Sequence, residues 1–302
     1  MGVNSKLLTP YRGRFAPSPT GPLHFGSLVA ALGSFLDAQQ HNGSWLVRIE
    51  DLDPPREQVG ASASILRTLE SFHLFWDEDV LYQHQRHALY EDHCQQLLAL
   101  NRGFYCSCSR SQLKGSHHIY PGTCRNHLQP QNSPCAIRFR IDDEELCFHD
   151  QIQGQYCQHL RKDVGDIVIK RKDQLYAYQL AVVCDDHAQG VTHVVRGSDL
   201  LDNTPRQLAL YRALRYPMPC YAHLPIVVNE TGQKLSKQNQ ALPLSQQDPR
   251  PTLLHALAAL QLHPPKELRS NNLDDILLWA NNNWNPSLLS KQRSSLCPQH
   301  LL

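Results

Sequence analysis

The stretch RFAPSPTGPLHFGSL, residues 14–28, sets three prolines and two glycines just before a helical pattern. A short strand can precede it, and apolar residues at helical spacing follow it, at Leu28, Val29, Leu32, Phe35 and Leu36. A strand that turns directly into a helix leaves backbone N–H groups at the helix start, where the helix dipole favours phosphate. Gly21 and Gly26 let a ligand approach closely, and His24 can donate to a phosphate oxygen. The stretch therefore predicts a phosphate-binding turn, with a proline-rich surface loop as the alternative.

Strand and helix patterns alternate along most of the chain. Residues 45–49 predict a strand, and apolar spacing predicts helices around 65–72 and 90–98, the second stopping at Gly103. After an irregular, cysteine-rich stretch, residues 137–141 and 166–170 predict strands of a more antiparallel lobe. Thr204–Gln207 is a capping box with proline at the first helical position, and two modest helices are expected near 253–260 and 273–280. Alternating strands and helices indicate a parallel sheet covered by helices.

Composition restricts the class of protein. The chain has 302 residues, 41% of them apolar and 19% charged, which is typical of a globular protein large enough for two or three lobes. No apolar run approaches the roughly 20 residues of a membrane helix, and the N-terminus has no signal-peptide core. Ten cysteines without a secretory signal favour the reducing cytoplasm, so most are expected to be small core residues or idle thiols.

Net charge limits how the chain could bind nucleic acid. A charge of +1 excludes a strongly basic binding domain, so RNA could be held only through local patches. Three basic groups are candidates for such patches, although each could also be a solvated face: Arg161 with Lys162, Lys170 with Arg171 and Lys172, and Arg212 with Arg215.

A second stretch, TGQKLSK at residues 231–237, places two lysines three positions apart on a loop that contains a glycine. Ammonium groups at Lys234 and Lys237 could lie over a polyphosphate and stabilise charge that develops in the transition state. Nearby lysines more often form a solvated basic loop, so this stretch alone is weak evidence.

Together these stretches resemble the class I aminoacyl-tRNA synthetases and, among them, the glutamyl branch. PLHFGS at 22–27 is similar to the first signature of that class, and KLSKQ at 234–238 is similar to the second, with changes from the commonest form in each. RFAPSPTG at 14–21, RIEDLD at 48–53 and the long segment 178–207 are closer still to the glutamyl enzymes. The resemblance extends from about residue 12 to about residue 240.

The resemblance implies a Rossmann-like α/β fold, a doubly wound parallel sheet with an inserted lobe, and a role for each matching residue. Arg14, Ala16 and Ser18 would line the sites of the amino acid and its adenylate, and Glu50 would bind the substrate ammonium, with a helix N-cap as its alternative role. Tyr178 and Arg196 would face the substrate side chain, and an arginine fork does select a carboxylate over an amide. ATP, with Mg²⁺, would be bound by His24, Gly26, Lys234 and Lys237, of which His24 and Lys237 would be catalytic.

Three clustered cysteines, Cys106, Cys108 and Cys124, form a plausible structural zinc site. Chemistry alone favours His117 or His118 as the fourth ligand, because neutral imidazole binds zinc more readily than a phenol with a pKa of about 10. The resemblance implies Tyr120 instead. The alternative is three reduced cysteines in a loop.

The length of the chain restricts which members of this family it can resemble. Only 64 residues follow Gln238, too few for the anticodon-reading region of a full-length glutamyl-tRNA synthetase. The chain is thus similar to shortened paralogues that activate glutamate without tRNA and place it on the queuosine base at the wobble position of tRNA(Asp). L-Glutamate, ATP and that tRNA are the implied partners of a cytoplasmic monomer. The alternatives are an enzyme that charges a tRNA 3′ end and a non-catalytic RNA-binding paralogue.

We expect four segments. Residues 1–103 and 176–240 would form the two catalytic halves, the first binding nucleotide and the second carrying the KLSKQ loop. Residues 104–175 would form the inserted zinc-binding and acceptor lobe, and residues 241–302 a helical C-terminal region without an anticodon-binding domain.

Overall fold

The computed structural model describes residues 10–109, 111–113, 119–128, 130, 133–229, 232, 244 and 248–296. The α-helices are α1 (Phe25–Gln40), α2 (Ala61–Ser71), α3 (His87–Ala99), α4 (Leu160–Asp163), α5 (Tyr178–Ala188), α6 (Thr204–Leu214), α7 (Pro249–Ala259) and α8 (Leu273–Asn283). The strands are β1 (Arg12–Phe15), β2 (Ser44–Ile49), β3 (Leu81–Tyr82), β4 (Gly103–Cys106), β5 (Ala136–Phe139), β6 (Glu145–Asp150), β7 (Gly154–His159), β8 (Ile167–Lys170), β9 (His193–Gly197), β10 (Cys220–Leu224), β11 (Ile226–Val228) and β12 (Ser294–Leu296). In the described part of the chain, no helix has the length and apolar character needed to cross a membrane.

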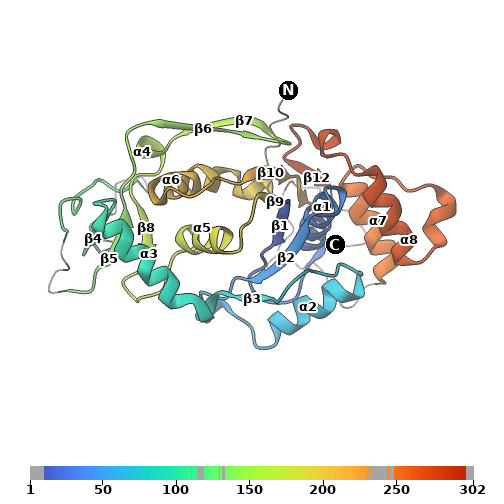
Figure 1. The fold of residues 1–302 in the computed structure, drawn as a ribbon, viewed down its shortest axis with the longest axis horizontal. Helices are drawn as coiled ribbons and strands as arrows, with labels where there is room; N and C mark the ends of the chain where they lie inside the picture. The colour runs from blue at the N-terminus through green and yellow to red at the C-terminus, as the bar shows by residue number, and fades with distance from the viewer. Residues whose placement is uncertain are drawn as a thin grey trace, which may run out of the picture.

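The centre of the molecule is parallel β-structure from segments far apart in the chain (Figure 1). β1 pairs in parallel with β2, and β2 with β3, whereas β9 pairs in parallel with β10. The amide of Thr192, just before β9, donates to the carbonyl oxygen of Arg12 at 2.9 Å, so β9 begins beside β1. From the junction of β1 and β9, the strand order thus continues through β2 and β3 on one side and through β10 on the other. Ligands of open parallel sheets bind at the carboxyl ends of the strands at such a switch point.

Helices cover both faces of the sheet because successive strand residues point to opposite sides. In β9, Val194 packs with residues of α3, α5 and α6, whereas Val195 packs with residues of α1, α7 and α8. In β10, Tyr221 likewise packs on the side of α3, α5 and α6, and Ala222 packs on the side of α1, α7 and α8. The α/β arrangement predicted from the alternating pattern is therefore present.

The segment expected to form an inserted lobe contributes to two sheets. β4, β5 and β8 form a separate antiparallel sheet, as its alternating residues predict. The β6–β7 hairpin instead extends the central strands, because Asp150 in β6 pairs with Tyr221 in β10. This hairpin connects the lobe to the strands that carry the candidate site.

Two cysteines of the hairpin form a disulfide, so the expectation of idle thiols was wrong at these positions. Cys147 in β6 lies opposite Cys157 in β7, with a Cα–Cα distance of 4.1 Å. Side chains opposed on antiparallel strands lie close enough for this bond, but the sequence alone does not reveal that the two residues are opposed.

The C-terminal helices α7 and α8 pack against α1 on one side of the sheet (Figure 1). Buried Asp37 of α1 joins this region to β1: it accepts hydrogen bonds from the Tyr11 hydroxyl, at 2.5 Å, and the Trp284 indole, at 2.9 Å. Farther along the chain, β12 pairs in parallel with β11. The C-terminal region is therefore part of the main core.

Two local predictions were wrong in detail. Helix α3 ends at Ala99, and Gly103 begins β4 instead of stopping the helix. Thr204 is the first residue of α6 and not its N-cap, which is Asn203 without a side-chain capping bond. The Thr204 hydroxyl instead accepts a hydrogen bond from Arg196 Nη2 at 2.8 Å, so a tertiary contact replaces the local one.

Candidate active site

A pocket of about 710 Å³ opens at the carboxyl ends of β1, β2, β9 and β10. Its wall includes the turn after β1, the segment after β2, the start of α5 and the residues that follow β9 and β10. Many of the residues predicted to bind amino acid or ATP line it: Arg14, Ala16, Ser18, His24, Gly26, Glu50, Tyr178 and Arg196. The sheet topology thus brings together residues separated by more than half of the chain.

The turn after β1 leads to the start of α1 as the opening stretch predicts. The amide of Glu50 donates to the carbonyl oxygen of Pro17 at 2.9 Å, and Gly21 has a φ of 136°, which favours glycine. His24 is the N-cap of α1, and its Nδ1 accepts a hydrogen bond from the Ser27 amide at 3.3 Å. With Nδ1 as acceptor, the neutral ring carries its proton on Nε2, a donor suited to a phosphate oxygen. The first residues of α1 line the pocket, so its N-terminus faces a potential anion site.

A buried carboxylate on α5 holds the arginines of the first two strands. Arg14 donates to Asp186 through Nε at 3.0 Å, and Arg48 donates to the same oxygen through Nη1 at 2.7 Å. All three side chains are buried. Although burial favours the neutral acid, the two guanidinium groups hold the pKa of Asp186 below its usual value. A buried ion group thus joins β1, β2 and α5.

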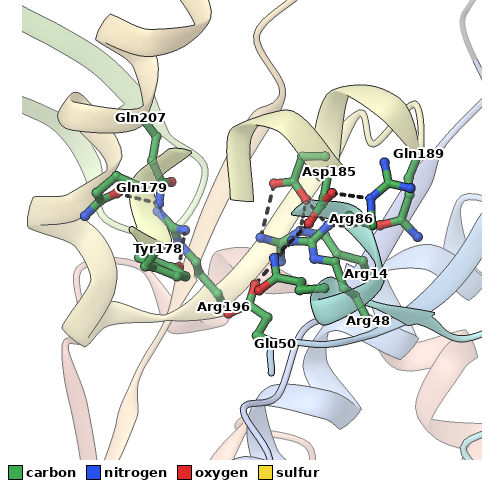
Figure 2. Close-up of polar contacts among 12 residues, drawn as sticks. Arg14, Arg48, Glu50, Arg86, Tyr178, Gln179, Asp185, Gln189, Arg196 and Gln207 are labelled. Atoms are coloured by element: carbon green, nitrogen blue, oxygen red, sulfur yellow. Dashed lines mark hydrogen bonds and ion pairs between the residues drawn. The ribbon is translucent and has the colours of Figure 1, made fainter. Parts of the chain in front are cut away.

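Glu50 lies beside this group, next to Arg48 and Arg14 (Figure 2). Its Oε1 is 3.4 Å from Arg48 Nη2, and its side chain is 9% exposed. Burial raises the pKa of Glu50, while Arg48 and Arg14 oppose the shift. The alternative role of helix N-cap does not apply, because Asp53 is the N-cap of the next short helix. Glu50 therefore supplies a carboxylate to the pocket wall.

Arg196 in β9 and Tyr178 at the start of α5 form a second polar group in the wall (Figure 2). Arg196 Nη1 donates to the Tyr178 hydroxyl at 3.4 Å. Burial raises the pKa of Tyr178, which keeps its hydroxyl neutral. A planar guanidinium beside a hydroxyl group is suited to bind a carboxylate through two parallel hydrogen bonds.

The cysteine cluster forms in the segment expected to be an inserted lobe, residues 104–175. The sulfur atoms of Cys106, Cys108 and Cys124 lie within 4.8 Å of one another, and the Tyr120 hydroxyl is 3.5 Å from Cys106 Sγ. Burial raises the pKa of the Cys124 thiol, but hydrogen bonds from Tyr120 and Ser107 outweigh it and lower the pKa to about 6. Zinc–sulfur bonds of about 2.3 Å place tetrahedral ligands about 3.8 Å apart, so the donor set fits zinc.

Comparison with known proteins supplies the family. A model of the class I tRNA synthetases (E and Q), catalytic domain, matches residues 11–270. A glutamyl-Q tRNA(Asp) synthetase of Ectopseudomonas mendocina is 49% identical over 286 residues, which cover 95% of this chain and 97% of that protein. The chain belongs to the class I tRNA synthetase family, E and Q type. A second relative, the glutamyl-Q tRNA(Asp) synthetase of Photobacterium profundum, is 50% identical over 277 residues, covering 91% of this chain and 89% of that protein.

The fold of this class I synthetase is similar to that of a solved glutamate tRNA ligase from Elizabethkingia meningosepticum, determined in complex with its amino acid. The TM-score is 0.80 at 23% identity, and the match covers 95% of this chain and 67% of the other. At this identity the similarity establishes the fold alone. The predicted class I α/β fold is confirmed.

Some residues predicted for this synthetase lie outside the part of the chain that the structure describes. They are Lys234, Lys237, His117 and His118. β11 ends at Val228, close in sequence to the segment that contains both lysines.

The basic residues considered for RNA contact are largely engaged within the protein. Arg161, Lys170, Arg171 and Arg212 each form an ion pair with a carboxylate. Lys172 donates to the carbonyl oxygen of Ser107. Arg171 also lines the pocket, which places one candidate for RNA contact beside the site.

Sequence reasoning assigned no separate role to the adjacent acids of α5. Asp185 is fully buried and accepts hydrogen bonds from Arg86, Gln83 and Tyr90 at 2.6, 2.8 and 2.7 Å, while Asp186 holds the arginines described above. Two adjacent acids directly after the apolar run 180–184 could have indicated this role, because buried carboxylates require hydrogen-bond donors.

Proposed function

We propose that the chain activates L-glutamate with ATP, without tRNA, and transfers the glutamate to the queuosine base at the wobble position of tRNA(Asp). The observation that carries the proposal is the single pocket that combines Arg196, Tyr178 and Glu50 with the N-terminus of α1. Relatives that match more than nine-tenths of the chain are named glutamyl-Q tRNA(Asp) synthetases, which supports this acceptor. The chain is thus a ligase of the class I synthetase family.

In the proposed complex, glutamate places its side-chain carboxylate on Arg196 and Tyr178 and its ammonium group on Glu50. The fork of Arg196 supplies donors that match a carboxylate, and the buried Glu50 supplies the opposite charge for the ammonium. Arg14, Ala16 and Ser18 line the pocket where the amino acid and its adenylate would lie. These contacts fix the α-carboxylate relative to ATP.

Activation then consists of one displacement. An oxygen of the α-carboxylate attacks the α-phosphorus of ATP, and the bond to the pyrophosphate oxygen breaks. His24 and the backbone amides at Gly26 stabilise the phosphates, and Lys234 and Lys237 add positive charge, while Mg²⁺ accompanies ATP. No covalent enzyme intermediate is required, since positioning and charge stabilisation lower the barrier.

Transfer is the second displacement. A nucleophilic group of the queuosine base attacks the carbonyl carbon of glutamyl-adenylate and loses its proton to solvent, and AMP leaves with the electron pair of the broken carbon–oxygen bond. We place the acceptor beside Arg171, which lines the pocket with a side chain that is 44% exposed, so an RNA phosphate would compete with Asp173 for its guanidinium.

The first test is ATP–pyrophosphate exchange with glutamate, with and without tRNA. We expect glutamate-dependent exchange without tRNA. Exchange only with tRNA would favour an enzyme that charges a tRNA 3′ end, and no exchange in either condition would favour a non-catalytic RNA-binding paralogue.

The acceptor is tested with periodate-oxidised tRNA, whose 3′-terminal ribose is destroyed. We expect transfer to be retained after an oxidation that destroys the 3′-terminal ribose but leaves the queuosine base intact. We expect the same result for queuosine-containing tRNA(Asp) whose 3′ end is blocked. Transfer abolished by a 3′ block alone would contradict the queuosine assignment.

We also propose that one structural zinc ion binds Cys106, Cys108, Cys124 and Tyr120 in the inserted segment 104–175. The four side chains lie together, and three thiols are a typical zinc donor set. We expect about one zinc per chain by elemental analysis, reduced at least several-fold in Cys108→Ser. The matched control is Cys135→Ser, at a cysteine outside the cluster, which keeps its zinc. Equal zinc in both variants would refute the site.

A further inference from the structure

A buried series of polar side chains connects Arg196 to the β6–β7 hairpin. His223, in β10, accepts a hydrogen bond at Nε2 from Arg196 Nε, at 3.1 Å. Its Nδ1 is 2.6 Å from Asp150 Oδ2, and its own backbone amide donates to Asp150 Oδ1 at 3.1 Å. Asp150 and His223 are both fully buried. The two residues form a pair behind Arg196.

These partners fix the protonation state and tautomer of His223. Because the Nε of Arg196 can only donate, His223 Nε2 must accept, and the proton of the neutral ring lies on Nδ1, where it is donated to Asp150. Burial lowers the pKa of His223 to about 4, against the opposing effect of Asp150. Although burial favours neutral Asp150, its hydrogen bond with His223 holds the pKa of Asp150 below the usual value. The pair therefore presents one oriented acceptor to Arg196.

The pair, with Thr204, fixes the guanidinium of Arg196 on the side away from Tyr178. Nε is held by His223 at 3.1 Å and Nη2 by the Thr204 hydroxyl at 2.8 Å. The Nη1 contact with pocket-lining Tyr178 is longer, at 3.4 Å. A planar group held at two of its nitrogen atoms cannot rotate without breaking a buried hydrogen bond, which costs free energy. These two hydrogen bonds therefore fix the direction of the remaining edge of the guanidinium, which carries Nη1.

We propose that Asp150 and His223 are positioning residues that orient Arg196 for a side-chain carboxylate and thereby set the preference for glutamate over glutamine. The inference rests on the proposed function of the pocket. Neither residue belongs to the pocket wall formed by the described residues, so both act through Arg196 and not by touching substrate. Asp150 comes from the hairpin of the inserted segment, which makes that hairpin part of the specificity of the site.

The test uses substitutions that separate the two hydrogen bonds of the ring. His223→Asn can still donate to Asp150 but loses the acceptor for Arg196, whereas His223→Gln can place an oxygen near the former Nε2. Asp150→Asn would donate to Nδ1 and turn Nε2 into a donor facing the Arg196 N–H. We expect His223→Asn and Asp150→Asn to raise KM for glutamate in pyrophosphate exchange by about 10-fold or more, with kcat changed less than about 3-fold. The ratio of kcat/KM for glutamate over glutamine should fall, and His223→Gln should restore part of it.

A buried carboxylate elsewhere provides the control. Asp37→Asn perturbs hydrogen bonds with Tyr11 and Trp284 but lies outside the described pocket wall, so it should lower stability and leave the glutamate-to-glutamine ratio unchanged. Thr204→Val, compared with Thr204→Ser, removes the second anchor of Arg196 and gives a milder variant should Asp150→Asn fail to fold.

Two failures are distinguishable. If the wild-type protein shows no glutamate-dependent exchange, the proposed function is wrong and the positioning role falls with it. If the wild type exchanges and folded His223→Asn and Thr204→Val keep its KM and its glutamate preference, only the positioning role is overturned.

Discussion

At the scale of single residues, Asp186 holds two buried arginines of the candidate site. It accepts hydrogen bonds from Arg14 and Arg48, and none of the three side chains is more than 3% exposed. Removing the charge of one member of a buried ion group leaves the other charges uncompensated, which costs more than the loss of an exposed pair. The arginines depend on Asp186 more than on any surface charge.

We predict that Asp186→Asn lowers the free energy of unfolding by about 3–5 kcal/mol, because two buried guanidinium groups lose their shared anion. Urea unfolding followed by circular dichroism measures this loss. The matched control is Glu78→Gln, which breaks the exposed pair with Arg12 and should cost less than about 1 kcal/mol. Equal costs would show that the buried group is not a stability determinant.

The same substitution predicts a pH dependence. The pKa of Asp186 in the folded protein is depressed, so its stabilising effect is complete above the unfolded-state pKa of about 4 and is lost as pH falls further. We expect the stability difference between wild type and Asp186→Asn to be constant near neutral pH and to shrink below about pH 4. A difference that grows on acidification would contradict this sign.

At the scale of elements, the short strand β11 depends on a partner from the C-terminal region. β12 pairs with it in parallel, and the Ile226 amide donates to the carbonyl oxygen of Arg293 at 3.0 Å. The neighbouring chain also contacts the hairpin, since the Lys291 amide donates to the carbonyl oxygen of Ile152 at 2.9 Å. The C-terminal segment therefore supports the strand that precedes the predicted lysine loop.

We predict that deleting residues 291–302 accelerates amide hydrogen exchange at Ile226 by about tenfold or more, the change expected when local opening becomes about 1.4 kcal/mol easier. Exchange in β9 should stay unchanged and serves as the internal control, because β9 pairs with β10. Mass spectrometry of peptides from the two strands measures both. Uniform acceleration in both strands would indicate global destabilisation instead.

Helices and strands could be predicted from the sequence more reliably than the side-chain contacts between them. Apolar spacing located α1, α2 and α7, because packing against one core imposes a local period. It could not reveal that Thr204 serves Arg196 instead of capping α6, or that Cys147 lies opposite Cys157. Both depend on partners set by the fold.

The same limit applies to the site. The motif residues of the pocket, such as Glu50 and Arg196, were identified by resemblance, and the structure places them in one cavity. His223 was missed because it lies within an apolar strand and its partner Asp150 is 73 residues away in sequence. The sequence feature that could have indicated it is a histidine within a strand whose other residues are mostly apolar and therefore expected to be buried.

At the scale of the whole molecule, the C-terminal region and the first strands share one core. α7 and α8 pack with α1, and the Trp284 indole donates to Asp37 at 2.9 Å. The Gln40 amide group donates to the carbonyl oxygen of Trp284 at 2.6 Å, which adds a second connection. The region should therefore unfold together with the sheet.

We predict that Trp284→Phe lowers the global free energy of unfolding by about 1–3 kcal/mol, since one buried oxygen of Asp37 loses its donor. Chemical unfolding should remain a single transition by circular dichroism. Trp279→Phe, at a half-buried position within α8, whose C-cap is Trp284, is the control and should cost less. An early separate transition in Trp284→Phe would show that the C-terminal region folds independently.

The shared carboxylate of Asp186 also constrains how this pocket can be changed by selection. Arg14, Arg48 and Asp186 come from β1, β2 and α5, so each is acceptable only in the presence of the other two. A library that randomises one of these codons should return almost only the parental residue. New substrate specificities are therefore more accessible by varying all three codons jointly, or by leaving them fixed and diversifying pocket residues outside this ion group.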